Sequence, residues 1–526
     1  MKDTPSCIMK KYNRSFMGLL SGLLIICLLV FAAAPLLAAD DSDQLTPSGR
    51  TLDEVLNDFE VYAEQAMEDW QVPGMAVAIV EGDQLVYARG FGVKEYEKHE
   101  PVTETTIFQI GSTSKAFTGA LLAMLVDEGK VNWDDRVIDH LPDFQMYDPW
   151  VTREFLVKDL MAQHSGLPGY EGDELTFFGF DRDHIIDSLR YFQPVSSFRS
   201  EFAYQNSLFL VVARLIEKVS GKSWEDMLEE RIFSPLGMEH STSDLAGYTY
   251  NQDSAHSHVL ADEESIVLSM DWPYHHWLYT YGPAGGINSN IIDMAEWLRL
   301  QLSHGTFEGQ VLLTKEQVSY MHSPHTPVLS AGHNHSYSAY CQAWVRTRYQ
   351  PYDLVWHDGG TAGMTSLVQL IPDAGLGFVV LTNLSGHRLP HSLGFYFIDL
   401  YFGNPLRDWS RHNLDAQQPE EPLPEPLEAP PLPLRLYTGT YINPVYGTAV
   451  VSEEEGTLKI TVGPKEAFFQ LLPWSRDTFI AEIPDSFAFI SDTLINFHFY
   501  GENRARAFVI DFLNQAGCGE WVRKDR

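Results

Sequence analysis

A proline-rich segment divides this 526-residue chain into a long and a short part. Seven of the fifteen residues between 419 and 433 are proline, and the remainder are Glu, Leu and Ala. Because proline lacks a backbone N–H and fixes φ, such a run continues neither a helix nor a central strand. We therefore expect an extended linker over 413–433, which separates a larger domain at 45–412 from a smaller one at 434–526.

The part that follows the linker has the residue pattern of short β-strands. Apolar and polar residues alternate over 458–462 and 495–499, and 505–510 is a third strand candidate. A period of two residues is typical of strands with one buried face. The sequence therefore predicts a small C-terminal antiparallel β-barrel at 434–526.

Ser112 and Lys115 form the only S-x-x-K sequence in the chain, at the start of a predicted apolar helix that Gly129 ends. Residues three apart share one face of a helix. A serine hydroxyl becomes a useful nucleophile when a neighbour takes its proton, and a lysine can do so once burial lowers its pKa. The pair is therefore a candidate catalytic site, and the alternative is a surface helix with an ordinary lysine.

Two further short motifs follow in the long part. Tyr204 and Asn206 form a Y-x-N sequence directly before an amphipathic helix predicted over 208–218. His357 and Gly359 form an H-x-G sequence within apolar runs that predict adjacent antiparallel strands. Both sequences also occur elsewhere, at 441–443 and at 164–166, so the order and spacing of the three motifs carry the argument.

In this order, the motifs resemble those of the serine β-lactamase and penicillin-binding superfamily. The closest match is its class C-like branch, which holds D,D-peptidases, D-aminopeptidases, esterases and β-lactamase-related hydrolases. The resemblance extends over residues 50–405, and neither the S-D-N sequence of class A enzymes nor the G-x-S-x-G sequence of α/β-hydrolases is present. It implies an α/β (α+β) fold, in which an antiparallel sheet is flanked by helices and joined to an all-helical subdomain. The C-terminal barrel resembles the lipocalin-like domain of some relatives.

The resemblance also implies how the catalytic residues act. Ser112 would attack the substrate carbonyl, while Lys115 and Tyr204 share the released proton. A phenol can serve as the base only if nearby cations hold its pKa down, and Lys115 is the candidate cation. Asn206 would orient Lys115 and a substrate amide. The alternative for Tyr204 is a core tyrosine with a satisfied hydroxyl group.

A second group of residues would bind the substrate. The backbone N–H groups of Ser112 and Gly360 would form the oxyanion hole, and Gly359 would let the strand approach the substrate closely. His357 stands where carboxylate-binding relatives carry Lys or His, but Asp358 replaces their threonine. An Asp358 that faces the site would repel an anionic substrate end, whereas one on the other face of the strand would not. The alternative for His357 is a histidine at a strand end without a role.

These residues predict a serine hydrolase that cleaves an amide, peptide or ester bond through a Ser112 acyl-enzyme. We expect its small-molecule or peptide substrate to have no carboxylate beside the scissile bond. The alternatives are a penicillin-binding protein or β-lactamase that acts on β-lactams, and a non-catalytic cell-wall-binding protein on the same fold. The chemistry requires no cofactor. One loop is crowded with histidines whose spacing matches no zinc motif, so we expect a solvated loop there: His322, His325, His333 and His335.

The N-terminus predicts export. Lys10, Lys11 and Arg14 precede an uncharged stretch over 16–39, which two aspartates follow. This pattern is typical of a signal peptide over 1–39, and the stretch is also long enough to span a bilayer uncut. We therefore expect a periplasmic or secreted enzyme, with residues 16–39 as its only membrane contact if they remain attached.

Charge and cysteine usage exclude several other classes. The formal net charge is −35, which disfavours nucleic acid and anionic membranes as partners. Beyond the signal segment only Cys341 and Cys518 remain, so a disulfide framework is not expected. The C-terminal domain is a candidate surface for assembly into a homo-oligomer.

Overall fold

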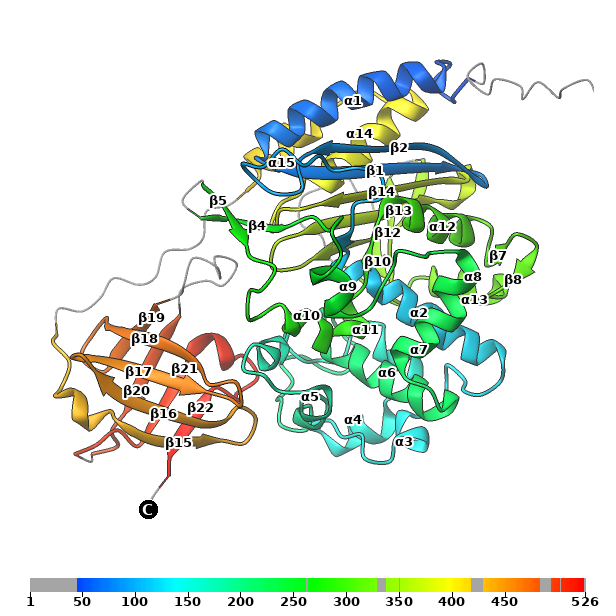
Figure 1. Ribbon diagram of the computed structural model, residues 1–526. Helices are drawn as coiled ribbons and strands as arrows, with labels where there is room; N and C mark the ends of the chain where they lie inside the picture. Colours follow the sequence, from blue (N-terminus) through cyan, green and yellow to red (C-terminus); the bar gives the residue numbers. More distant parts are fainter. Residues whose placement is uncertain are drawn as a thin grey trace, which may run out of the picture. The chain divides into compact units, whose positions relative to one another are not determined.

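The computed structural model describes residues 45–261, 264–328, 337–349, 351–417, 429–482, 493–501 and 503–524 (Figure 1). These residues belong to one compact unit that begins at Leu45. The predicted signal segment 1–39 and most of the proline-rich linker lie outside the described residues. Within the described ranges, no helix is both long and apolar enough to cross a membrane.

An eight-stranded antiparallel sheet is the centre of the larger part, in the order β2-β1-β14-β13-β12-β11-β10-β9. Its strands are β1 (Gly74–Glu81), β2 (Gln84–Gly92), β9 (Thr326–Pro327), β10 (Ser338–Tyr340), β11 (Val345–Tyr349), β12 (Tyr352–Gly360), β13 (Thr365–Ile371) and β14 (Leu376–Thr382). β13 and β14 are buried along their whole length, which explains their nearly continuous apolar sequences. The adjacent antiparallel strands predicted around His357 are β12, β13 and β14.

Helices cover both faces of this sheet. On one face, α1 (Leu52–Asp69) and α14 (Leu389–Phe402) pack together, followed by α15 (Trp409–Asp415). Phe59 of α1 lies edge-on to Phe378 and Phe397, with ring centroids 5.9 and 5.6 Å apart. On the other face, α12 (Ile291–Leu302) packs on β1 and β14. The expected sheet flanked by helices is confirmed.

A helical subdomain adjoins the second face and holds α2 (Ser114–Asp127) at its centre. Its other helices are α3 (Val137–His140), α4 (Pro149–Glu154), α5 (Arg182–Ser188), α6 (Ser207–Ser220), α7 (Trp224–Leu228), α8 (Ser234–Leu236), α9 (Leu245–Thr249), α10 (His276–Thr280), α11 (Gly282–Gly285) and α13 (Lys315–Met321). Short 3₁₀ turns include η2 (Gly111–Thr113), η3 (Val157–Leu160) and η4 (Asp173–Thr176). Because α6, α11 and α13 surround α2, almost all of its residues are buried, which accounts for its apolar sequence.

The residues after the linker form a closed eight-stranded antiparallel barrel. Its strands are β15 (Gly439–Asn443), β16 (Gly447–Glu454), β17 (Thr457–Val462), β18 (Ala467–Pro473), β19 (Thr478–Glu482), β20 (Leu494–His498), β21 (Ala507–Ile510) and β22 (Glu520–Arg523). The three strands predicted from residue alternation correspond to β17, β20 and β21. Aromatic rings fill the interior, and Phe508 stacks on Trp521 with centroids 5.1 Å apart. The predicted C-terminal barrel is confirmed.

The structure places both cysteines and part of the histidine cluster. Cys341 and Cys518 are free thiols, and both are buried. The expected solvated loop is wrong at His322, which is buried beside Trp344, and His325 is half-buried. His333 and His335 lie outside the described residues. Among the residues that the structure describes, no group of three or more His, Cys, Asp or Glu could hold a metal ion.

Candidate active site

The nucleophile lies where a tight turn meets the end of a strand. Gly111 has a φ of +54°, and a Cβ at this position would lie 2.7 Å from the backbone nitrogen of Gly360. Only glycine combines this backbone conformation with so close an approach. Ser112 therefore sits in the 3₁₀ turn η2, beside the end of β12 and two residues before α2 begins.

Lys115 is fully buried and its ammonium group is held by three oxygen atoms. Nζ lies 3.0 Å from Oγ of Ser112, 2.6 Å from Oδ1 of Asn206 and 2.7 Å from the carbonyl oxygen of Ala284. Burial lowers the pKa of Lys115 to about 7, although the charges of Asp173 and Asp358 act in the opposite direction. A lysine with this pKa is partly neutral near pH 7, so it can accept the serine proton.

Tyr204 faces the same pair but is not an activated phenolate. Its hydroxyl oxygen is inaccessible to solvent and makes no hydrogen bond to the described residues. Lys115 Nζ lies over the ring, 4.8 Å from its centroid. Burial raises the pKa of Tyr204 well above its usual value, and the nearby Ser112 offsets this only in part. The cation therefore does not hold the phenol pKa down, and Lys115 is the better base while Tyr204 can donate a proton.

Asn206 connects the lysine to a carboxyl group that carries no sequence motif. Its Oδ1 accepts from Lys115, while its Nδ2 donates to Oδ2 of Asp173 over 2.6 Å. Burial raises the pKa of Asp173 to about 7, and the repulsion of Glu174 adds to this effect. The other oxygen of Asp173 has no hydrogen-bond partner in the described part of the chain. Sequence reasoning missed Asp173, because it lies in a loop far from the three motifs.

The two glycines at the end of β12 differ in their surroundings. A Cβ at Gly359 would lie 2.1 Å from the carbonyl oxygen of Ile110 and 3.0 Å from the backbone nitrogen of Ser112. A Cβ at Gly360 would meet nothing within 4 Å. The end of β12 therefore lies directly against the turn that holds Ser112, and the backbones that carry the N–H groups of Ser112 and Gly360 lie side by side. This is the arrangement that an oxyanion hole requires.

His357 is buried and neutral. Its Nε2 lies 2.9 Å from the hydroxyl of Tyr340, and its Nδ1 lies 2.6 Å from the carbonyl oxygen of Asp358. Burial lowers the pKa of His357 to about 4, so the ring carries no charge at neutral pH. Tyr340, which no motif predicted, therefore holds a histidine that presents no cation to a substrate carboxylate.

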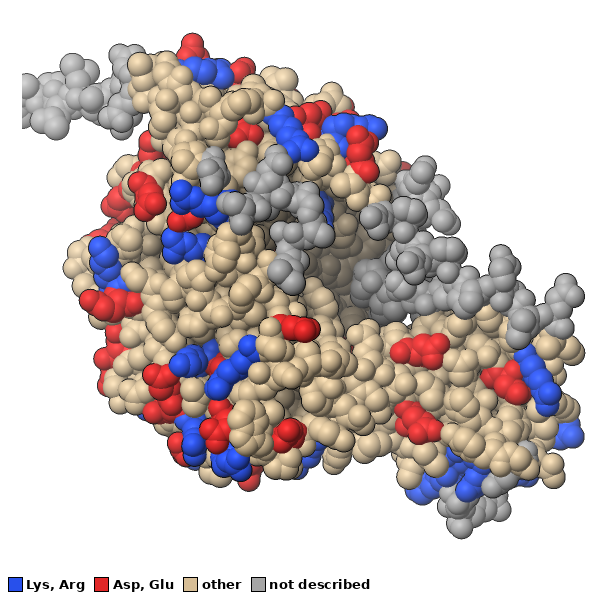
Figure 2. Space-filling model, turned by 180° about the vertical axis from the view of Figure 1, so that it is seen from behind, with Lys and Arg blue, Asp and Glu red and all other residues tan. Residues whose placement is uncertain are grey.

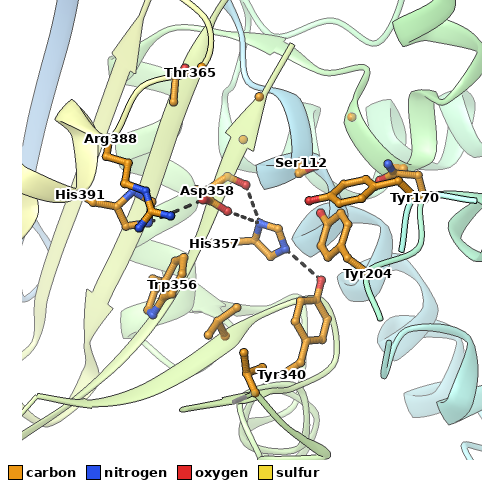
Figure 3. A pocket seen from close by; sticks show the side chains of 18 of the residues that line it. Ser112, Tyr170, Tyr204, Tyr340, Trp356, His357, Asp358, Thr365, Arg388 and His391 are labelled. Atoms are coloured by element: carbon orange, nitrogen blue, oxygen red, sulfur yellow. Dashed lines mark hydrogen bonds and ion pairs between the residues drawn. The ribbon is translucent and has the colours of Figure 1, made fainter. Parts of the chain in front are cut away.

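Asp358 lines the pocket, whereas the sequence left open whether it faces the site or the other side of the strand. Its side chain is about half exposed, and one carboxylate oxygen lies 3.7 Å from Nε2 of His391 in α14 (Figure 3). Its negative charge also reaches Lys115, whose pKa it raises. The position at which carboxylate-binding relatives carry a hydroxyl is therefore anionic here.

The site opens into a pocket of about 710 Å³ whose wall includes several aromatic residues. In Figure 3, Ser112, Tyr170 and Tyr204 lie together, and His357 with Tyr340 lies across from them. Further aromatic residues that line the pocket are Phe202, Trp277, Tyr281, Trp356 and Phe395. A volume of this size accommodates a peptide or a drug-sized molecule.

All seven predicted site residues meet at this pocket or bond directly to residues that line it: Ser112, Lys115, Tyr204, Asn206, His357, Gly359 and Gly360. The competing sequence matches lie elsewhere. Tyr441 is in the barrel core, and His164 bonds to Asp159 over 2.9 Å. The order of the motifs, rather than any one of them, identified the site.

On the molecular face drawn in Figure 2, the Lys and Arg side chains of the described residues are interspersed with Asp and Glu.

A serine hydroxyl bonded to a buried lysine of lowered pKa, beside an oxyanion-type turn, is a serine hydrolase site. The comparison with protein families agrees. The Beta-lactamase family model matches residues 59–400, and this chain belongs to that family. A domain of unknown function, DUF3471, matches residues 423–517, which include most of the barrel.

Similar proteins are known from fungi and from an archaeon. The unguisins hydrolase ungD′ of Aspergillus campestris is 30% identical over 482 residues, which cover 83% of this chain and 85% of that protein. The unguisins hydrolase ungD of Aspergillus violaceofuscus is 26% identical, with 77% and 78% covered. The octameric penicillin-binding protein homologue from Pyrococcus abyssi has the same fold, with a TM-score of 0.60 and 21% identity over 89% of this chain and all of that one.

Proposed function

We propose that this protein hydrolyses an amide, peptide or ester bond through an acyl-enzyme on Ser112. The observation that carries the proposal is the 3.0 Å contact between Ser112 Oγ and a fully buried Lys115 whose pKa burial lowers to about 7. This lysine supplies a base at the pH where the enzyme would work, without a cofactor.

The proposed reaction uses the groups in turn. Ser112 Oγ bonds to the carbonyl carbon while its proton passes to Lys115, and the carbonyl electron pair moves to the oxygen, where the N–H groups of Ser112 and Gly360 hold it. The bond to the leaving group then breaks. Tyr204 gives the leaving group its proton and regains one from the Lys115 ammonium. Water then attacks the acyl-enzyme ester in the reverse sequence. Its proton passes through Tyr204 to Lys115, and Lys115 returns a proton to Ser112 Oγ as the acid product leaves.

We propose further that the substrate is an amide, peptide or ester without a carboxylate beside the scissile bond. His357 is neutral and Asp358 is anionic where carboxylate-binding relatives place a cation and a hydroxyl. An anion there opposes a carboxylate at close range. The two Aspergillus relatives are named as hydrolases of unguisins, which supports hydrolysis rather than mere binding.

Export and self-assembly belong to the same proposal. The basic residues before the apolar stretch over 16–39 support export to the periplasm or the medium. The homologue from Pyrococcus abyssi is described as octameric, which supports a homo-oligomer, with the barrel as the proposed contact.

A labelling experiment with a substrate panel tests this function. We expect a fluorophosphonate probe to label the wild type but not Ser112→Ala, while both melt at the same temperature. Nitrocefin, a D-alanyl p-nitroanilide and a short-chain p-nitrophenyl ester then separate the substrate classes. Equal labelling of both proteins would place the nucleophile elsewhere. Fastest turnover of nitrocefin would refute the argument from Asp358, and a stable penicillin adduct without turnover would favour a penicillin-binding protein.

A further inference from the structure

Three acidic residues lie within four positions of one loop beside the active site. Glu171 is buried, and Asp173 and Glu174 at the start of η4 are half-buried, with one carboxylate oxygen of Asp173 inaccessible to solvent. Burial raises the pKa of all three, and that of Glu171 reaches about 8. Buried carboxyl groups so close together are costly unless each finds a donor.

The donors come from two different parts of the chain. Asn206 donates to Asp173 from the catalytic side. The hydroxyl of Tyr446, which lies between β15 and β16 of the barrel, donates to Oε1 of Glu174. The backbone N–H of Ala516, also in the barrel part, holds down the pKa of Glu171. The barrel therefore stabilises two of the three carboxyl groups.

Additional hydrogen bonds fix the barrel to the segment that follows the loop. The backbone nitrogen of Lys465 donates to the carbonyl oxygen of Phe178 over 3.2 Å. Nε2 of His184 lies 2.7 Å from the carbonyl oxygen of Val445, and Gln193 N–H donates to the carbonyl oxygen of Ala516 over 3.1 Å. The barrel thus holds residues 171–193 along their length.

A continuous path of contacts leads from this junction to the nucleophile. Glu174 and Asp173 are neighbours on η4, Asp173 bonds to Asn206, and Asn206 bonds to Lys115. The charge of Glu174 raises the pKa of Asp173, and the charge of Asp173 raises the pKa of Lys115. Asp358 and His357 are the other titratable groups that act on Lys115 and its surroundings.

We propose that the C-terminal barrel has a role in catalysis, and that Tyr446 is a positioning residue for the catalytic lysine. By holding Glu174, it fixes η4 and so keeps Asp173 on the Asn206 amide that orients Lys115. This inference rests on the proposed function, because it assumes that Lys115 activates Ser112. It gives the domain of unknown function at 423–517 a task within the active site of its own chain.

The test compares two tyrosines of the barrel. Tyr446→Phe removes only the hydroxyl that reaches Glu174. Tyr441→Phe is the matched control, because that hydroxyl is equally buried but donates to the carbonyl oxygen of Tyr437 within the barrel. The readouts are the second-order rate of fluorophosphonate labelling between pH 5 and 9 and the melting temperature.

We expect Tyr446→Phe to slow labelling at pH 7 roughly tenfold and Tyr441→Phe to leave it within about twofold of the wild type. The pH midpoint should rise in Tyr446→Phe. Without its donor the pKa of Glu174 rises further, so Glu174 repels Asp173 less. Asp173 then ionises more readily, and its charge raises the pKa of Lys115.

Glu174→Gln provides a second variant that retains an oxygen acceptor for the phenol but removes the charge. It should shift the midpoint in the same direction, even if Tyr446→Phe melts too low to be assayed. Unchanged midpoints in both variants, or equal rates for Tyr446→Phe and Tyr441→Phe, would overturn the inference. An absence of Ser112 labelling in the wild type would instead overturn the proposed function.

Discussion

Replacing Asp173 with Asn removes one charge from the active site and changes almost nothing in shape. The Asn206 amide spans the gap between two hydrogen bonds of 2.6 Å, so the carboxylate and the Lys115 ammonium are at most about 7.5 Å apart. Two unit charges at about 7.5 Å attract by about 2.2 kcal/mol at an effective dielectric constant of about 20. This energy corresponds to about 1.6 pKa units.

The shift to be observed is smaller, because the pKa of Asp173 is itself raised to about 7 and the group is only partly ionised there. We therefore expect Asp173→Asn to lower the pKa of Lys115 by roughly 1 unit near neutral pH. Since the neutral lysine is the base, labelling of the nucleophile should begin at lower pH than in the wild type. The direction is opposite to that expected for Glu174→Gln.

The assay is the rate of fluorophosphonate labelling as a function of pH, measured on protein whose melting temperature matches the wild type. Asp358→Asn is the control, because its carboxylate is half exposed and solvent screens its charge. It should move the midpoint in the same direction but by less. A midpoint that stays in place or rises in Asp173→Asn would refute the reasoning that links Asp173 to Lys115.

Two further predictions concern the base and the strand beside it. Lys115→Arg retains a cation but cannot lose its proton, so labelling and turnover should fall at least about 100-fold although the protein still folds; near-normal labelling would exclude this lysine as the base. Gly359→Ala places a Cβ 2.1 Å from the carbonyl oxygen of Ile110, whereas Gly360→Ala meets nothing within 4 Å. Thermal or urea unfolding should show a loss of about 1–3 kcal/mol for the first variant and little for the second, and equal stabilities would contradict the close contact.

The sequence predicted the parts of this protein that depend on local patterns. Ser112 and Lys115 share a helical turn, so their spacing alone brings them together. Alternating residues over 458–462 and 495–499 predicted strands of the barrel, because a half-buried strand requires that alternation. The order and spacing of the three motifs then identified the catalytic site, which no single motif could do.

Local sequence patterns could not predict the contacts between segments that are distant in the chain. Asp173 has no neighbouring motif, and it reaches Asn206 only because η4 packs against α10 and is bonded to Tyr446 of the barrel. The Lys115 cation was expected to hold down the pKa of the Tyr204 phenol, but burial dominates and raises that pKa. The strength of burial at one atom depends on every element around it, and a linear sequence does not reveal that.

The contact between Gly111 and Gly360 has a consequence for how such enzymes diversify. Gly111, which precedes the nucleophile, and Gly360, which carries one N–H group of the oxyanion hole, are in backbone contact. No side chain lies between them that a substitution could enlarge or shrink. Substitutions that adapt the enzyme to a new substrate therefore have no side chain to replace at this contact. They must act on the side chains that line the rest of the pocket, such as Trp277 and Phe395, which make no hydrogen bond to the catalytic residues in the described part of the chain.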